Sequence, residues 1–309
     1  MPDFSDQFEN FDRALAQSPH YRPAEAKRFS MNARTGIGKL ATTSTALGHW
    51  FGLLTRLDFD SRLFGIEEAR LEPIIVPECF SPLTLDILAQ SNEFVESVIA
   101  NARKAGIDHI TAPVKTRDSF ALIVLQHAGF TMSDTMIVHA IDLATFEAAP
   151  RTSTIRQARS DDSDALERIS AECFGSRRYN ANRFNCDPAF HPAGVESLYR
   201  QWAVKSVNKT MADEVLVYEM DGAIAGFITV SMTSNVAAIP LNAVAPEYQG
   251  RGVYTALVKA ALAMLKERGA STVEIRTQLA NLAVHQTWRR LGASIVDAHH
   301  TLRCRIATS

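Results

Sequence analysis

Hydrophobic and polar positions in the second half of the chain follow the order of an α/β protein. Residues 239–244 form an apolar run typical of a buried strand, and a loop with two glycines follows it. From Val253 apolar side chains recur every three or four residues, which predicts a helix. A strand at 272–277, Asn281 and a helix at 282–291 come next. The unpaired N–H groups at the glycine-preceded helix start predict a seat for a diphosphate.

The sequence before this stretch predicts the rest of one sheet. Residues 154–158, 215–219 and 223–232 have strand patterns, and the last two are joined by a hairpin signal, Asp221-Gly222. Helices are predicted near 161–173 and 195–202. The fold class expected is α/β, with a central mixed β-sheet flanked by helices.

The first half repeats part of this pattern at one constant offset, the distance from Gly106 to Gly269. Gly106 and Gly129 are as far apart along the chain as Gly269 and Gly292, and each pair encloses a strand and a helix. The same offset places residues 138–143 on 301–306, the predicted closing strands. We interpret this as two copies of one α/β unit.

The two copies differ where chemistry is expected. The first has no glycine loop before its long helix, and Asp118 stands at the place of Asn281. We therefore expect it to bind no cofactor but to extend the sheet and line one side of an acceptor cleft. The predicted domains are an N-terminal appendage (1–50), a degenerate copy (51–149) and a complete copy (153–309). The appendage is expected to hold a short amphipathic helix before Pro19 and a loop over 30–47.

Composition narrows the function classes. With 309 residues, 46% hydrophobic and 21% charged, the chain is typical of a globular protein of two domains. A net charge of −2 disfavours nucleic acid and membrane surfaces as partners. No apolar run is long enough for a membrane span, no signal peptide is visible, and the four cysteines lack metal spacing. We expect a cytoplasmic protein without a metal.

The motif order resembles motifs A and B of the GNAT superfamily, the acyl-CoA-dependent N-acyltransferases, over residues 153–306. The superfamily loop, Gln/Arg-x-x-Gly-x-Gly/Ala, matches at Gln249 and Gly252 and departs at Tyr254. The resemblance implies a GNAT fold, preceded here by a degenerate GNAT-like half, and acetyl-CoA as cosubstrate. It assigns cofactor binding to one strand residue, the loop and two helix starts: Val244, Gln249, Gly250, Arg251, Gly252, Val253, Tyr254 and Asn281. Trp288, further along the second helix, is expected to line the pantetheine or to belong to the core.

Catalytic residues are harder to assign from the resemblance. Trp288 stands where the superfamily has a tyrosine that protonates the leaving thiolate, and an indole cannot act as that acid. Residues 237–244 carry no carboxylate for a water-mediated base. The candidates are Asn242, which can orient an amine, with Tyr254 and His285, although a packing role is the commoner one for Tyr254 and a surface or structural role for His285. Asn281 could be a plain helix cap and Arg251 a solvated charge. The possible bases left open are Glu219, Asp187, His191 and a water chain.

Two further stretches suggest an acceptor. Residues 57–65, Leu-Asp-Phe-Asp-Ser-Arg-Leu-Phe-Gly, and residues 183–188 with 198–202 resemble the TDP-fucosamine acetyltransferase group. That group acetylates the amino group of nucleotide-linked 4-amino-4,6-dideoxy sugars. The resemblance implies a small-molecule amine as partner, with Arg183 and Asp187 in substrate binding. Arg177, Arg178 and Arg183 are candidate partners of a second diphosphate, and the alternative for them is a solvated basic loop.

Other functions remain open. The acceptor could be another small-molecule or protein amine, or the chain could be an acyl-CoA-binding module without turnover. Phe4, Phe8 and Phe11 could seal an intramolecular groove or form a homodimer contact.

Overall fold

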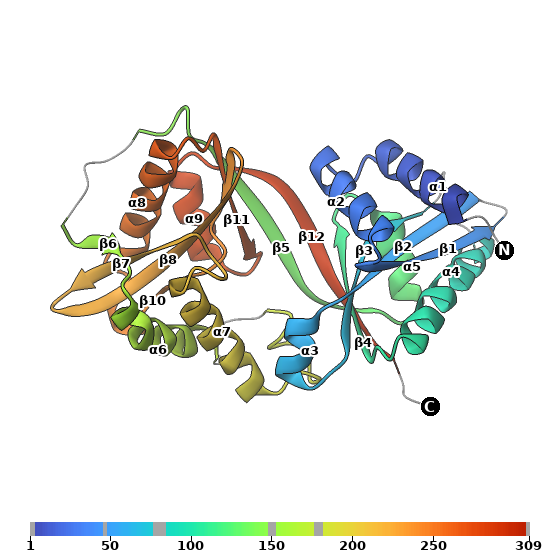
Figure 1. Cartoon of the computed structure of the whole chain (residues 1–309), viewed down its shortest axis with the longest axis horizontal. Helices are drawn as coiled ribbons and strands as arrows, with labels where there is room; N and C mark the ends of the chain where they lie inside the picture. The colour runs from blue at the N-terminus through green and yellow to red at the C-terminus, as the bar shows by residue number, and fades with distance from the viewer. Residues whose placement is uncertain (1–3, 46–47, 77–84, 148–152, 176–181, 307–309) are drawn as a thin grey trace. The chain divides into compact units, whose positions relative to one another are not determined.

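The computed structural model describes residues 4–45, 48–76, 85–147, 153–175 and 182–306, which form two compact units (Figure 1). The first unit contains Met1–Asp134 and His299–Ser309, and the second contains Thr135–Ala298. The predicted domain boundary at 148–152 lies outside the described residues, and the domain limits expected from sequence remain a prediction. No helix in the described part of the chain is long and apolar enough to cross a membrane.

The first unit is a mixed sheet covered by helices. Its strands lie in the order β1, β2, β3, β4 and the end of β12, with β3 and β4 parallel and the other neighbours antiparallel. A core cluster joins α4 and α5 to this sheet. The elements are α1 (Phe4–Gln17), α2 (Pro23–Arg34), β1 (Gly38–Thr45), β2 (Gly48–Arg56), α3 (Asp58–Phe64), β3 (Glu68–Ile75), α4 (Leu85–Lys104), β4 (His109–Lys115) and α5 (Ser119–His127).

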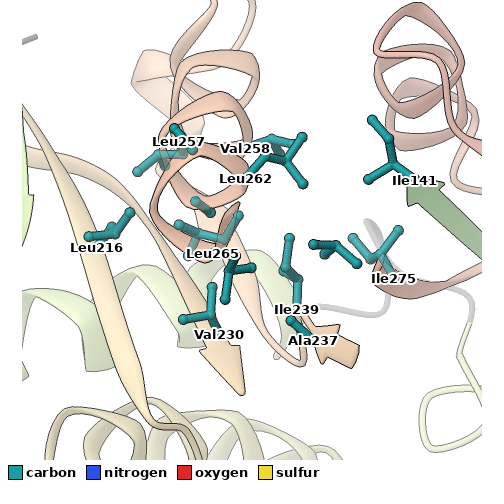
Figure 2. Close-up of a cluster of buried hydrophobic side chains, with 14 of the residues drawn as sticks. Ile141, Leu216, Val230, Ala237, Ile239, Leu257, Val258, Leu262, Leu265 and Ile275 are labelled. Carbon is teal, nitrogen blue, oxygen red and sulfur yellow. The ribbon is translucent and has the colours of Figure 1, made fainter. Parts of the chain in front are cut away.

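The second unit has the sheet order β5, β11, β9, β8, β7, β6, and β10 also pairs with β8. Figure 2 shows the apolar face of α8 lying over strand residues such as Val230, Ile239 and Ile275. The elements are β5 (Thr131–Asp142), β6 (Ile155–Gln157), η1 (Ser160–Asp162), α6 (Ser163–Phe174), α7 (Pro192–Val207), β7 (Glu214–Met220), β8 (Ala223–Thr233), β9 (Val236–Ala238), β10 (Asn242–Val244), η2 (Pro246–Tyr248), α8 (Val253–Glu267), β11 (Thr272–Gln278), α9 (Leu282–Arg290) and β12 (Ser294–Arg305).

The N-terminal segment differs in part from its prediction. The amphipathic helix before Pro19 is confirmed as α1, whereas the loop predicted over 30–47 is wrong, because α2 extends to Arg34 and β1 begins at Gly38. The small and polar residues of this stretch are typical of a loop, so the sequence did not predict the end of α2 or the strand β1. Side chains of α1 and α2 form a buried cluster with β2 and β3, so the segment is packed into the first unit. The cluster contains Phe11, Leu15, Tyr21, Phe29, Ala33, Phe51, Leu53 and Ile75.

The structure supports the predicted duplication in detail. The offset that relates Gly106 to Gly269 also relates both ends of β4 to those of β11, and the same is true of α5 and α9 and of β5 and β12. The closing strands are also exchanged between the copies. Residues 136–142 of β5 pair with β11 in the second unit, and residues 299–305 of β12 pair with β4 in the first. This exchange explains why the first unit consists of two separate stretches of chain.

Because of the exchange, the C-terminal strand should stabilise the first unit. Leu302 of β12 is fully buried in the core of that unit. We expect Leu302→Ala to lower the free energy of unfolding by about 2–5 kcal/mol and to speed amide exchange in β4. Ile295→Ala on the same strand is the control, since Ile295 is 64% exposed. Faster exchange in β11 with β4 unchanged would contradict the pairing.

Candidate functional site

The site of the second unit begins where two parallel strands stop pairing. β9 pairs with β11 from Thr272↔Val236 to Glu274↔Ala238. One more bond follows, from the Ile239 N–H to the Glu274 carbonyl at 3.1 Å. In the described part of the chain, β10 then pairs only with β8, while β11 continues to Gln278 beside β5. The two strands therefore leave a stretch without a ladder between them.

Main-chain groups of β10 face this stretch. The bonds to β8 flanking β10 are Thr229 N–H to Leu241 O at 2.8 Å and Ala245 N–H to Ala225 O at 2.9 Å. Because such bonds alternate along an antiparallel strand, the main-chain groups of Asn242 and Val244 point away from β8. The Val244 carbonyl accepts bonds from Gln249 Nε2 (3.1 Å) and Cys173 Sγ (3.3 Å). These two side chains hold the end of β10 in place.

Gly226 is a site residue that the sequence analysis missed. It lies opposite Val244 in β8, and a Cβ there would lie 2.8 Å from the Ala243 carbonyl oxygen and 3.2 Å from the Val244 Cα. Only glycine allows β10 this close approach. An isolated glycine in a predicted strand was the signal that could have revealed it.

The predicted glycine loop has a backbone geometry that suits an anion-binding site. Gly250 and Gly252 have φ values of 75° and 82°, and a Cβ on either would meet nothing within 4 Å. Gly252 is the N-cap of α8 and provides no side-chain cap. The first N–H groups of α8, from Val253 onward, therefore keep their capacity to bind an anion. The exposed Arg251 lies over the Tyr248 ring at 5.5 Å, which keeps its charge at the loop.

Asn281 begins α9, but the plain-cap interpretation of its side chain is wrong. Its side chain makes no cap bond, and Nδ2 donates instead to Thr277 Oγ1 at 3.1 Å. In the first unit, Asp118 at the same repeat position accepts a bond from the Ala121 N–H at 3.0 Å. The helix start is thus capped in the first copy and left open in the second.

Trp288 and Tyr254 form one structural pair. Trp288 is fully buried, and its Nε1–H donates to Tyr254 Oη at 3.0 Å. Burial raises the pKa of Tyr254 well above its usual range, although the bond from Trp288 opposes the shift. The phenol therefore stays protonated and is a weak acid toward a thiolate. It can still donate a hydrogen bond.

His285 contacts a second histidine, His139 of β5, which sequence reasoning missed. His285 Nε2 lies 3.1 Å from the Gln278 carbonyl, and its Nδ1 lies 2.7 Å from His139 Nε2. Because a carbonyl only accepts, His285 donates from Nε2 and accepts at Nδ1, so His139 donates to it. Burial and the facing His285 lower the pKa of His139. The first unit has leucines at the corresponding repeat positions: Leu122 corresponds to His285, and Leu302 corresponds to His139.

The side chains of the remaining described polar candidates contact other groups of the protein. Asp187 is buried and its Oδ1 accepts from the Ala189 N–H at 2.9 Å, whereas the Arg183 guanidinium lies 4.2 Å from the Phe184 ring centroid. His191 caps α7 by accepting from the Gly194 N–H at 2.9 Å. Glu219 pairs with Arg156 at 2.6 Å. Arg177 and Arg178 lie outside the described residues.

Comparison with known proteins decides the family of this unit. The family model described as Acetyltransferase (GNAT) family matches residues 167–293, which contain the divergent strands, the glycine loop and both helix starts. Residues 167–293 are therefore a GNAT acetyltransferase domain. The chain is also 24% identical over 236 residues to dTDP-fucosamine acetyltransferase of Escherichia coli O6:H1, covering 76% of this chain and 97% of that protein.

Solved structures agree with the GNAT domain and with the duplicated fold. A GCN5-related N-acetyltransferase from Sphaerobacter thermophilus aligns with a TM-score of 0.58 at 16% identity, over 96% of this chain and 90% of that one. A tandem GNAT protein from the clavulanic acid biosynthesis pathway aligns with a TM-score of 0.56 at 15% identity, over 99% and 95% of the two chains. The predicted fold class, a GNAT fold preceded by a degenerate GNAT-like half, is confirmed.

The histidine pair should make the stability of the GNAT domain depend on pH. The folded pKa of His139 lies below its ordinary value of 6.5, so the unfolded chain takes up the proton first. Its contribution is complete above pH 6.5 and falls as the pH drops from 6.5 toward the folded pKa. We expect His139→Leu/His285→Leu, which copies the first unit, to flatten this slope by up to about 1.4 kcal/mol per pH unit.

Urea unfolding between pH 5 and 8 measures this effect. His127→Ala, at an exposed position of α5, is the control and should leave the slope unchanged. An unchanged slope in the double variant would contradict the lowered pKa of His139 in the folded state.

Proposed function

We propose that the GNAT domain transfers an acetyl group from acetyl-CoA directly to a primary amine, the amino group of a nucleotide-linked amino sugar. The observation that supports it best is the divergence of β10 from β11 beside two uncapped helix starts. The acceptor is supported by the similarity to dTDP-fucosamine acetyltransferase over 97% of that protein.

Cofactor binding would use mostly main-chain groups. The loop amides from Gly250 to Tyr254 would hold the pyrophosphate, with Arg251 adding charge. The main-chain groups of Asn242, which point away from β8, would bind the pantetheine arm. Gln249 fixes the loop to β10 through the Val244 carbonyl, while Asn281 keeps its amide oxygen uncommitted to its own helix. These residues fit a CoA thioester without needing a further charged side chain.

Acyl transfer forms a C–N bond to the amine and breaks the thioester C–S bond, and a proton from the amine is finally taken by the leaving thiolate. The N–H of Val244, which points away from β8, would stabilise the charge that develops on the thioester oxygen. Asn242 would orient the amine. We assign Tyr254 and Trp288 to positioning, because the raised pKa of the phenol makes it a poor proton donor. His285 remains a candidate for moving the proton through its bond to His139.

A binding module without turnover is the second candidate. It is favoured by Trp288 at the superfamily's tyrosine position and by the structural contacts of Glu219, Asp187 and His191. Its weakness is that positioning and an oxyanion donor can supply most of the acceleration in acyl transfer.

Free-thiol release tests the proposal. Purified protein is incubated with acetyl-CoA and a panel of amines: a TDP-linked 4-amino-4,6-dideoxy sugar, a UDP-linked amino sugar, an aminoglycoside and a peptide with a free N-terminus. We expect thiol release with a nucleotide-linked amino sugar. Thiol release with one of the other amines only would identify that amine as the acceptor and contradict the nucleotide-linked amino sugar. CoA binding with no release from any amine would favour the module.

The glycine loop predicts a specific defect in cofactor binding. Gly252→Val puts a β-branched residue at φ 82° and a side chain into the space proposed for the pyrophosphate. We expect the KM for acetyl-CoA to rise at least about tenfold. Gly222→Val is the matched control, because Gly222 has φ 76° and equally open surroundings in the β7–β8 turn. Both should lose about 1–2 kcal/mol of stability to backbone strain. Similar KM values in the two variants would contradict the assignment.

A further inference from the structure

The first unit has its own pair of diverging parallel strands. β3 pairs with β4 from Glu68↔His109 to Arg70↔Thr111. β3 then extends to Ile75 beside β2, and β4 extends to Lys115 beside β12. In the described part of the chain no further β3–β4 pairs follow. This is the arrangement that β9, β10 and β11 have in the GNAT domain.

The strand registers match residue by residue. Glu68 and Val236 pair with His109 and Thr272, which are the same repeat position. β3 therefore corresponds to β9 and β10, and counting onward from Glu68 and Val236 aligns Ile74 with Asn242. Both units also shift register by one position against the neighbouring antiparallel strand just before this point. Ile74 thus lies where the main-chain groups of the GNAT domain point away from the neighbouring antiparallel strand.

A side chain from the N-terminal segment binds those main-chain groups in the first unit. Tyr21, between α1 and α2, donates from Oη to the Ile74 carbonyl at 3.1 Å and accepts from the Ile74 N–H at 3.0 Å. Burial raises the pKa of Tyr21, so its phenol stays protonated and can make both bonds. One hydroxyl thus satisfies the donor and the acceptor that the diverging strands leave unpaired.

Charged contacts fix the same segment to β4 and the start of α5. Glu25 of α2 accepts from Lys115 Nζ at 3.0 Å, and both side chains are mostly buried. Arg117 donates to the His20 carbonyl at 2.9 Å, and His20 Nε2 lies 3.8 Å from the Asp118 carboxylate. Lys115 corresponds to Gln278 and Asp118 to Asn281, so these contacts lie at the strand end and helix start that face the proposed cofactor in the GNAT domain.

We propose that residues 20–25 are a built-in occupant of the first unit's cofactor position, with the Tyr21 hydroxyl bound where a coenzyme amide would bind. The comparison with a coenzyme rests on the proposed function, whereas the occupancy itself rests on the contacts of Tyr21, Glu25 and Lys115. The N-terminal helices thereby complete the degenerate copy. The chain accordingly keeps one open cofactor position instead of two.

Amide exchange at Ile74 tests the proposal on the full-length protein. Tyr21→Phe removes the hydroxyl and keeps the ring in its apolar cluster. We expect exchange of the Ile74 amide to speed up about tenfold and the melting temperature to fall by a few degrees. Tyr218→Phe is the control, since the Tyr218 hydroxyl has no hydrogen bond among the described residues. Unchanged Ile74 exchange in Tyr21→Phe would overturn the proposal.

Adding CoA separates this proposal from the proposed function. In the wild type, CoA should slow exchange of the Asn242 amide and leave that of Ile74 unchanged. Slower exchange at Ile74 on adding CoA would overturn the occupancy. If Tyr21→Phe exposes Ile74 but Asn242 does not respond to CoA, the occupant is supported and the proposed cofactor site fails.

Discussion

Two parallel strands that stop pairing inside a sheet leave main-chain N–H and C=O groups in need of partners, because buried backbone groups without hydrogen bonds are costly. Both units of this chain have that constraint at positions that correspond in strand register, Ile74 and Asn242. In the first, the Tyr21 hydroxyl satisfies Ile74. In the GNAT domain, the main-chain groups of Asn242 and the Val244 N–H point away from β8, and the proposed ligand would bind them, whereas the Val244 carbonyl accepts from Gln249 and Cys173. The two units therefore differ in what satisfies the same main-chain groups.

The copies differ further in ways that follow from it. Asp118 closes its helix start, whereas Asn281 turns its amide to Thr277 and leaves α9 open. The GNAT domain also contains a histidine pair where the first unit has two leucines, which shows that the shared fold needs no polar contact there. The two copies thus share one scaffold and differ in the contacts made at the same positions. The exchanged closing strands join the two copies, since each unit needs a strand from the other copy to complete its sheet.

The sequence predicted what depends on local patterns. The strand, glycine loop and helix around Gly252 were readable because glycine and apolar spacing are local signals, and the duplication was visible as a fixed offset. Contacts between residues that are far apart in the sequence could not be predicted in this way. His139 lies 146 residues from its partner His285, and Tyr21 lies 53 residues from Ile74. The pairing of Trp288 with Tyr254 likewise needs the packing of α8 on α9. The loop predicted at 30–47 failed because burial against β2 and β3, and not local propensity, determines α2 and β1.

The stoichiometry of coenzyme binding tests the central claim most directly, because the two units share one strand arrangement and differ in what occupies it. Titration calorimetry of the full-length protein with CoA should give one site per chain. Two sites per chain would show that the N-terminal segment leaves the first unit open. No heat of binding at any temperature would show that the diverging strands and glycine loop of the GNAT domain are not a coenzyme site.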